Sequence, residues 1–203
     1  MTHSLSIGTD SDRALLLDFQ ATLETKPEKA IKLEKDALAQ IENITADNAR
    51  LVSNLHANLG GLYRMNGHPD LAREHMEKSI SLLDQFNLLH INDSIPQIAN
   101  YAMFLTEQQE PERGISELQK LSGIIKEYHS DHCLDYAKVQ ETLGTIYLMT
   151  ANLPQAKTHF KKAFKIYEKI WADEPEMIEA KYQEIQELYP QVGSFLGQQI
   201  SSS

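Results

Sequence analysis

Small residues recur in this chain at a constant interval of 42 positions. One set, with an aspartate in its first place, is Asp18, Gly60, Ala102 and Gly144. A second set follows it by twelve positions and is Ala30, Ala72, Gly114 and Ala156. An interval of this length is typical of a stacked array of repeats, in which no single unit can bury its apolar face without a neighbour. The interval therefore predicts a repeat architecture over most of the chain.

Each unit has the pattern of two helices joined by a turn. A proline opens the second helix of each unit, at Pro27, Pro69, Pro111 and, one place late, Pro154. Proline suits the first turn of a helix because its φ is fixed and it lacks an N–H group. We therefore expect an all-α chain with four helix-turn-helix units and a capping helix. The expected ranges are roughly 11–45, 53–87, 95–129 and 137–171 for the units and 175–199 for the cap.

The second and fourth units carry a recognisable motif. Leu59-Gly60-x-x-Tyr63 followed by Ala72, and Leu143-Gly144-x-x-Tyr147 followed by Ala156, resemble tetratricopeptide repeats (TPRs). The usual TPR has 34 residues, and the longer unit resembles the repeats of kinesin light chains. The resemblance covers roughly residues 10 to 190. It implies an α-solenoid, a right-handed superhelix of helix pairs, which forms a single TPR domain over residues 10–199.

The first unit departs from the TPR pattern at two positions. Asp18 occupies the tight small-residue position, and Glu34 occupies a position that is usually aromatic. Terminal repeats are often atypical because one of their faces meets solvent instead of a neighbour.

Composition bears on compartment and order. The single cysteine, Cys133, rules out an internal disulfide and favours a reducing compartment. The segment from Met1 to Asp10 is polar, and no run of 18 apolar residues occurs, so we expect neither a signal peptide nor a membrane span. We expect a cytoplasmic protein with disordered ends at 1–9 and 200–203.

The net charge of −10 disfavours nucleic acid as a partner, because 29 acidic residues outnumber 19 basic ones. One basic stripe stands out on the last predicted helix pair, at Lys157, Lys161, Lys165 and Lys169. The stripe has two interpretations. It faces solvent and is balanced by carboxylates of the next helix, namely Glu176, Glu179, Glu184 and Glu187, or it contacts an anionic partner.

The sequence contains no motif of a known catalytic or phosphate-binding site. The densest group of reactive side chains lies between His129 and Cys133. It could ligate a metal, or Ser130 or Asp131 could cap a helix there. We expect a protein that is not an enzyme and that holds neither a cofactor nor a metal. An enzyme or metal protein that uses this cluster is the alternative.

The resemblance to TPR proteins also implies a binding face, lined by the first helix of each pair. In kinesin-light-chain-like members, an asparagine just before the Leu-Gly or Leu-Ala position binds the main chain of an extended peptide. Asn58 and Asn100 occupy that position here, whereas the first and fourth units carry Leu16 and Thr142. A carboxamide suits this role because it offers a donor and an acceptor to one peptide unit. The expected peptide-binding residues on this face are Asn54, Asn58, Arg64, Met65, Asn100, Met103, Lys138 and Glu141.

These features predict a scaffold that binds an extended or helical peptide segment of a protein in a concave groove. The alternative is a regulatory peptide sensor that acts on a separate output protein. Neither nucleic acid nor membrane is expected as a partner, and the end repeats could form a homo-oligomer.

Overall fold

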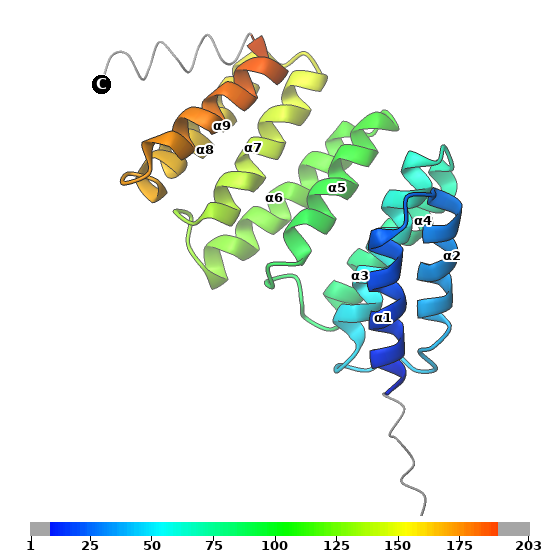
Figure 1. The fold of residues 1–203 in the computed structure, drawn as a ribbon. Helices are drawn as coiled ribbons and strands as arrows, with labels where there is room; N and C mark the ends of the chain where they lie inside the picture. The colour runs from blue at the N-terminus through cyan, green and yellow to red at the C-terminus, as the bar shows by residue number, and fades with distance from the viewer. Residues whose placement is uncertain (1–8, 191–203) are drawn as a thin grey trace, which may run out of the picture. The chain divides into compact units, whose positions relative to one another are not determined.

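The computed structural model describes residues 9–190, and these residues form nine helices and no strand (Figure 1). The all-α prediction is confirmed. The helices are α1 (Asp10–Leu23), α2 (Pro27–Leu38), α3 (Ala49–Met65), α4 (Pro69–Gln85), α5 (Ser94–Glu107), α6 (Pro111–Tyr128), α7 (Leu134–Met149), α8 (Leu153–Ile170) and α9 (Pro175–Leu188). The predictions for residues 1–8 and 191–203 lie outside the described residues. None of the helices between Thr9 and Pro190 is both long and apolar enough to cross a membrane.

Local sequence signals explain where the helices begin. Thr9 caps α1, because its hydroxyl accepts a hydrogen bond from the backbone N–H of Asp12 and its own N–H donates to the Asp12 carboxylate. Prolines open α2, α4, α6 and α9, as their fixed φ favours. Pro154 takes the second place of α8, which begins at Leu153.

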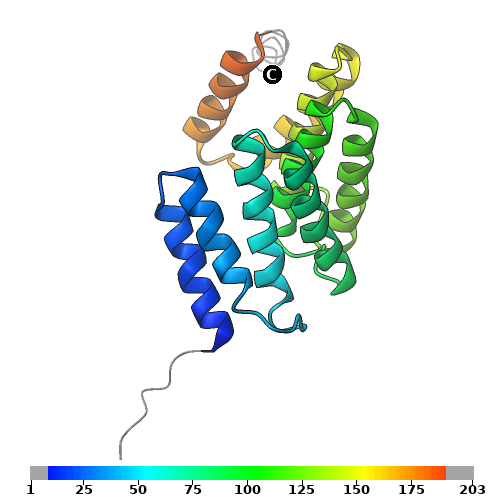
Figure 2. The ribbon, with the colours of Figure 1, turned by 90° about the vertical axis from the view of Figure 1, so that its right-hand side faces the viewer.

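The chain forms two compact units, and the division falls between Tyr101 and Ala102, inside α5. In the first unit, α1 packs on α2, α2 on α3, and α3 on α4, and Figure 2 shows the neighbouring helices α1, α2 and α3. In the second unit, α6 packs on α7 and α7 on α8.

The residues of the 42-position interval mark the closest helix contacts. A Cβ on Gly60 would lie 2.6 Å from Met76 Cγ, and a Cβ on Gly144 would lie 2.8 Å from Phe160 Cδ2. Around these points each unit buries its own apolar core, which includes Leu55 and Leu59 in the first unit and Leu143 and Phe160 in the second. Small residues are needed there because the facing helices leave no space for a side chain.

Candidate functional site

A hollow of about 360 Å³ opens on the first unit, and both Asn58 and Asn100 line it. Asn58 comes from α3 and Asn100 from α5. Residues of α1, of α2 and of the turn between them form the rest of its wall, together with Ala57, Gly61 and Leu62 of α3. The space beside Gly61 is open, because a Cβ built there has no atom within 4 Å. The two asparagines that the sequence singles out are therefore brought to one hollow.

Asn58 also binds two carboxyl groups of the first helix pair. Its Nδ2 donates to Asp18 Oδ1 at 2.9 Å and to Glu34 Oε1 at 3.1 Å. Glu34 is only 2% exposed, and its Oε2 is buried with no hydrogen-bond partner among the described residues. Burial, and then the charge of Asp18, raise the pKa of Glu34 to about 8, although the bond from Asn58 opposes this shift. Glu34 is consequently mostly protonated near neutral pH.

The repeat register explains why these two acids meet. Asp18 and Glu34 stand where the second unit has Gly60 and Met76, which are in close contact. The first unit thus replaces an apolar contact by a pair of carboxyl groups. The sequence shows both departures, but it does not show that Asn58 of the next unit binds them.

The hollow keeps polar atoms available for a ligand. Asn100 is exposed, and in the part of the chain that the structure describes its amide forms no hydrogen bond. Asn58 Oδ1 is likewise without a donor there, because both bonds of Asn58 involve its Nδ2. Glu24 and Glu34 are the acidic residues of the lining, and no described residue that lines the hollow is Lys or Arg. The hollow therefore offers amide groups in acidic surroundings.

Comparison with known proteins agrees with this architecture. Residues 94–169 match the family model described as tetratricopeptide repeat. Residues 94–169 are TPRs. No curated protein matches the sequence of the chain.

Solved structures with the same fold cover most of the chain. The crystal structure of BtubC (BKLC) from P. vanneervenii is similar, with a TM-score of 0.71 and 18% identity over 91% of this chain and 74% of that chain. A crystal structure of nearly identical TPR-like repeats from Podosopora anserina, named for kinesin light chain, has a TM-score of 0.69 and 13% identity over 82% of this chain and 81% of that chain. At these identities the likeness is one of fold. It confirms the predicted fold class.

Asn54, which was predicted to contact a ligand, holds α3 against α5 and the loop before it. Its Oδ1 accepts from Gln97 Nε2 at 2.6 Å, and its Nδ2 donates to Asp93 Oδ2 at 3.3 Å. Arg50 Nε binds the same Asp93 oxygen at 2.6 Å, and this contact lowers the pKa of the Asp93 carboxyl. Both ends of the Asn54 amide are therefore occupied inside the first unit.

Glu141 is also engaged within its own unit. Its Oε2 accepts from the Tyr167 hydroxyl at 2.6 Å, and its Oε1 pairs with Lys181 Nζ at 2.8 Å. These contacts connect α7 with α8 and α9. Burial, and then the nearby Glu141 charge, raise the pKa of Tyr167, so the phenol keeps the proton that it donates.

The other predicted residues are dispersed. Met65 is 76% exposed at the end of α3, and Arg64 beside it is half-buried. Met103 and Lys138 belong to the second unit, where the Lys138 ammonium lies 3.8 Å from Asp135. Of the eight predicted residues, the structure brings Asn58 and Asn100 together at one hollow.

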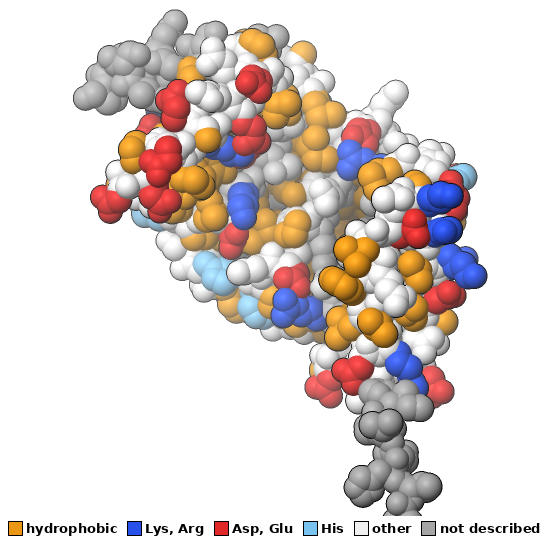
Figure 3. Space-filling model, in the orientation of Figure 1, with side chains coloured by type: hydrophobic (Ala, Val, Ile, Leu, Met, Phe, Trp, Pro, Cys, Tyr) orange, Lys and Arg blue, Asp and Glu red, His pale blue; other side chains and the backbone are white. Residues whose placement is uncertain are grey.

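An exposed apolar face on α1 was missed in the sequence. Leu16, Phe19 and Leu23 are 58%, 60% and 67% exposed. Figure 3 shows hydrophobic side chains gathered over this helix. Leu16 and Phe19 hold the repeat positions of Asn58 and Gly61, so the repeat register places them on the binding face that the TPR pattern implies. The 42-position spacing between Leu16 and Asn58 is the sequence signal that could have predicted this exposed face.

The segment from His129 to Cys133 leads into α7 and supplies its N-terminal cap. Cys133 Sγ accepts from the N–H of Tyr136 at 3.4 Å and caps the helix, which corrects the expectation of a cap at Ser130 or Asp131. The cap lies later because α7 begins at Leu134. Among the side chains that the structure describes, no group of three or more His, Cys, Asp and Glu is placed to hold a metal ion.

Proposed function

We propose that this chain is a non-catalytic scaffold that binds an extended or helical peptide segment of a partner protein on the first-helix face of its repeats. The TPR fold is in general that of a protein–protein interaction scaffold without catalytic activity. The observation that carries the proposal is that Asn58 and Asn100 line one hollow and keep amide atoms without a partner.

The chemistry of the hollow suits the main chain of a peptide. Asn100 offers a donor and an acceptor together, and Asn58 offers its Oδ1 as an acceptor for a peptide N–H. The open space at Gly61 admits a ligand side chain. Binding through the main chain fixes the path of the ligand without selecting its sequence.

Two neighbouring features would select the sequence of the ligand. The exposed Leu16, Phe19 and Leu23 of α1 favour apolar side chains, because burial of these three residues removes apolar surface from water. The charged carboxylate of Glu24 favours a basic residue at the hollow. The best ligand is therefore a segment with apolar residues next to a Lys or Arg.

Selection from a library of displayed random peptides tests the proposal, followed by measurement of Kd for a selected peptide. Asn100→Ala should weaken binding about three- to tenfold without a change in Tm, since its amide forms no internal hydrogen bond. Phe19→Ser should weaken the binding of the same peptide. Asn92→Ala, at an exposed asparagine before α5, is the matched control. Peptides that bind Asn100→Ala and Phe19→Ser as tightly as the wild type would refute the assigned face.

The regulatory sensor, the cytoplasmic location and a homo-oligomer through the end repeats stay predictions. The sensor differs from a plain scaffold in one measurable way, because it requires a second protein whose activity changes when the peptide binds.

A further inference from the structure

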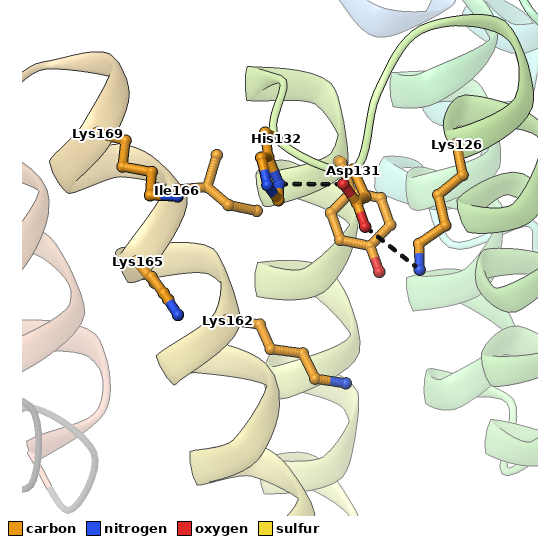
Figure 4. Close-up of a pocket in the computed structure, with 8 residues that line it drawn as sticks. Lys126, Asp131, His132, Lys162, Lys165, Ile166 and Lys169 are labelled. Carbon is orange, nitrogen blue, oxygen red and sulfur yellow. Dashed lines mark ion pairs between the residues drawn. The ribbon is translucent and has the colours of Figure 1, made fainter.

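A second hollow, of about 330 Å³, lies in the second unit, and four of its eight lining residues are lysines (Figure 4). Lys162, Lys165 and Lys169 come from α8, and Lys126 comes from α6. The remaining lining residues are Asp131, His132, Tyr136 and Ile166. This concentration of positive charge stands out in a chain whose net charge is −10.

The three lysines of α8 that line the hollow are not paired with a carboxylate in the part of the chain that the structure describes. They follow one another at i, i+3 and i+7, which places them on one face along about 10 Å of helix. Within residues 9–190, none of Lys162, Lys165 and Lys169 forms an ion pair. Like charges at this spacing destabilise a helix slightly. The arrangement therefore has a cost that a bound anion would offset.

The basic stripe predicted from the sequence overlaps only in part with the lysines that line this hollow. Lys165 and Lys169 line the hollow together with Lys162, whereas Lys157 and Lys161 do not. Among the described residues no carboxylate of α9 forms an ion pair with Lys165 or Lys169, and Glu184 pairs instead with Lys181 at 3.0 Å.

The one carboxylate of the lining is directed to the opposite wall. Asp131 Oδ2 lies 3.8 Å from Lys126 Nζ, and its Oδ1 lies 3.0 Å from His132 Nδ1. Lys126 Nζ also lies 5.2 Å from the centre of the Tyr136 ring. Figure 4 shows Lys162 extending from α8 toward the side of Lys126, across the space of the hollow. The charge of Asp131 is thus shared by two groups and leaves the α8 lysines unbalanced.

We propose that this hollow binds the phosphate groups of a small polyphosphorylated molecule. Ammonium groups are compact, rotatable charges that bind phosphate oxygens as point charges, and cations on two walls can hold more than one phosphate. The volume suits a small ligand. Tyr136 and Ile166 add an apolar part to the lining, against which an organic group of the ligand can pack. A nucleic acid fits less well, because the acidic remainder of the chain repels an extended phosphate backbone.

Calorimetric titration with inorganic tripolyphosphate, at about 150 mM salt, tests the proposal. Lys162→Gln/Lys165→Gln should weaken binding about tenfold or more. The matched control is Lys157→Gln/Lys161→Gln, which removes the same charge from the same helix outside the hollow and should leave Kd nearly unchanged. Asp131→Asn should tighten binding several-fold, because it removes the negative charge of the hollow.

Two further titrations distinguish the sources of the phosphate. A nucleoside triphosphate that binds more tightly than tripolyphosphate indicates contacts of its base with Tyr136 and Ile166, and equal affinities indicate that only phosphate is bound. Both results support the proposal. It is overturned if tripolyphosphate does not bind the wild type, if both double variants lose affinity equally, or if a polyglutamate peptide of equal charge binds more tightly than tripolyphosphate.

Discussion

His75 is stacked on Tyr63, with ring centroids 5.4 Å apart and an angle of 20° between the rings. His159 repeats this arrangement on Tyr147, with centroids 5.2 Å apart and the same angle. The two stacks lie two repeat intervals apart in the sequence. The repeat therefore fixes a specific aromatic contact in the second and fourth units, in addition to the small residues.

Each stacked histidine has a hydrogen-bonding partner on the first helix of its pair. His75 Nδ1 lies 2.8 Å from His56 Nδ1, and His159 Nδ1 lies 2.9 Å from Gln140 Oε1. Burial lowers the pKa of His56 and of His159 to about 4 in each case, and it lowers that of His75 as well. These rings are neutral at pH 7.

We predict that the chain loses stability as the pH falls from about 6.5 to 4. In this window the unfolded histidines bind protons near their ordinary pKa, while folded His56 and His159 resist protonation until about pH 4. The contribution of these histidines to the free energy of unfolding is therefore complete above the window and is lost through it. Urea denaturation at a series of pH values measures this slope.

Two exchanges of side chains separate the histidine pair from other acid effects. His56→Gln copies the partner that the fourth unit uses and should flatten the slope. Gln140→His copies the second unit and should steepen it, because it places a second imidazole beside His159. Parallel pH profiles for both variants and the wild type would show that the His56–His75 contact does not cause the acid sensitivity.

Glu34 predicts a pH dependence of the opposite sign. Its folded pKa of about 8 is raised, so its contribution to stability is complete below its unfolded pKa and is lost as the pH rises toward 8. Glu34→Gln should remove this loss, because the glutamine amide can donate to Asp18 and still accept from Asn58. We expect the variant to be more stable than the wild type by about 1–3 kcal/mol at pH 8 and by less at pH 5. Thermal unfolding at both pH values, with the exposed Glu42→Gln as control, measures the difference.

The fold could be predicted from the sequence because the decisive signals are periodic. The small residues mark close helix contacts, and the prolines mark helix starts, so spacing alone locates the helix pairs. Two further consequences of the register were not predicted. The first is the stacking of histidines on Tyr63 and Tyr147. The second is the contact between the carboxyl groups of Asp18 and Glu34.

The candidate sites were less predictable because side-chain partners do not follow from register. Asn54 shares a face with Asn58, yet Gln97 and Asp93 occupy its amide. A stripe at i+4 spacing drifts by about 40° per step around a helix, so Lys161 lies outside the hollow that Lys165 and Lys169 line. Spacing predicted the basic surface, and only the structure shows which lysines line one hollow.

The turns within the helix pairs supply a third prediction. Gly67, Gln109 and Ala151 stand at the 42-position interval and have positive φ values of 76°, 64° and 58°. Such a conformation favours glycine, because a Cβ crowds the backbone there. Gln109→Gly should therefore stabilise the chain by about 0.5–1 kcal/mol.

The same substitution at an ordinary helical position is the control for the turn. Gln119→Gly, at an exposed position inside α6, should destabilise the chain by about 1 kcal/mol. Opposite shifts of Tm for the two variants would support strain in the turn. A loss of stability in Gln109→Gly comparable to that in Gln119→Gly would show that this turn carries no such strain.

The close helix contacts lead to a final prediction about glycine. A Cβ on Gly114 would lie 2.6 Å from the carbonyl oxygen of Ala102, a backbone atom that can move little, whereas a Cβ on Gly123 meets no atom within 4 Å. Gly114→Ala should therefore destabilise the chain by roughly 1–3 kcal/mol, and Gly123→Ala should stabilise it by up to about 1 kcal/mol. Gly60→Ala should cost less than Gly114→Ala, because the atom nearest to its Cβ belongs to the flexible Met76 side chain. Urea denaturation of the three variants gives the order directly, and equal stability of Gly114→Ala and Gly123→Ala would mean that the interval does not mark a steric contact.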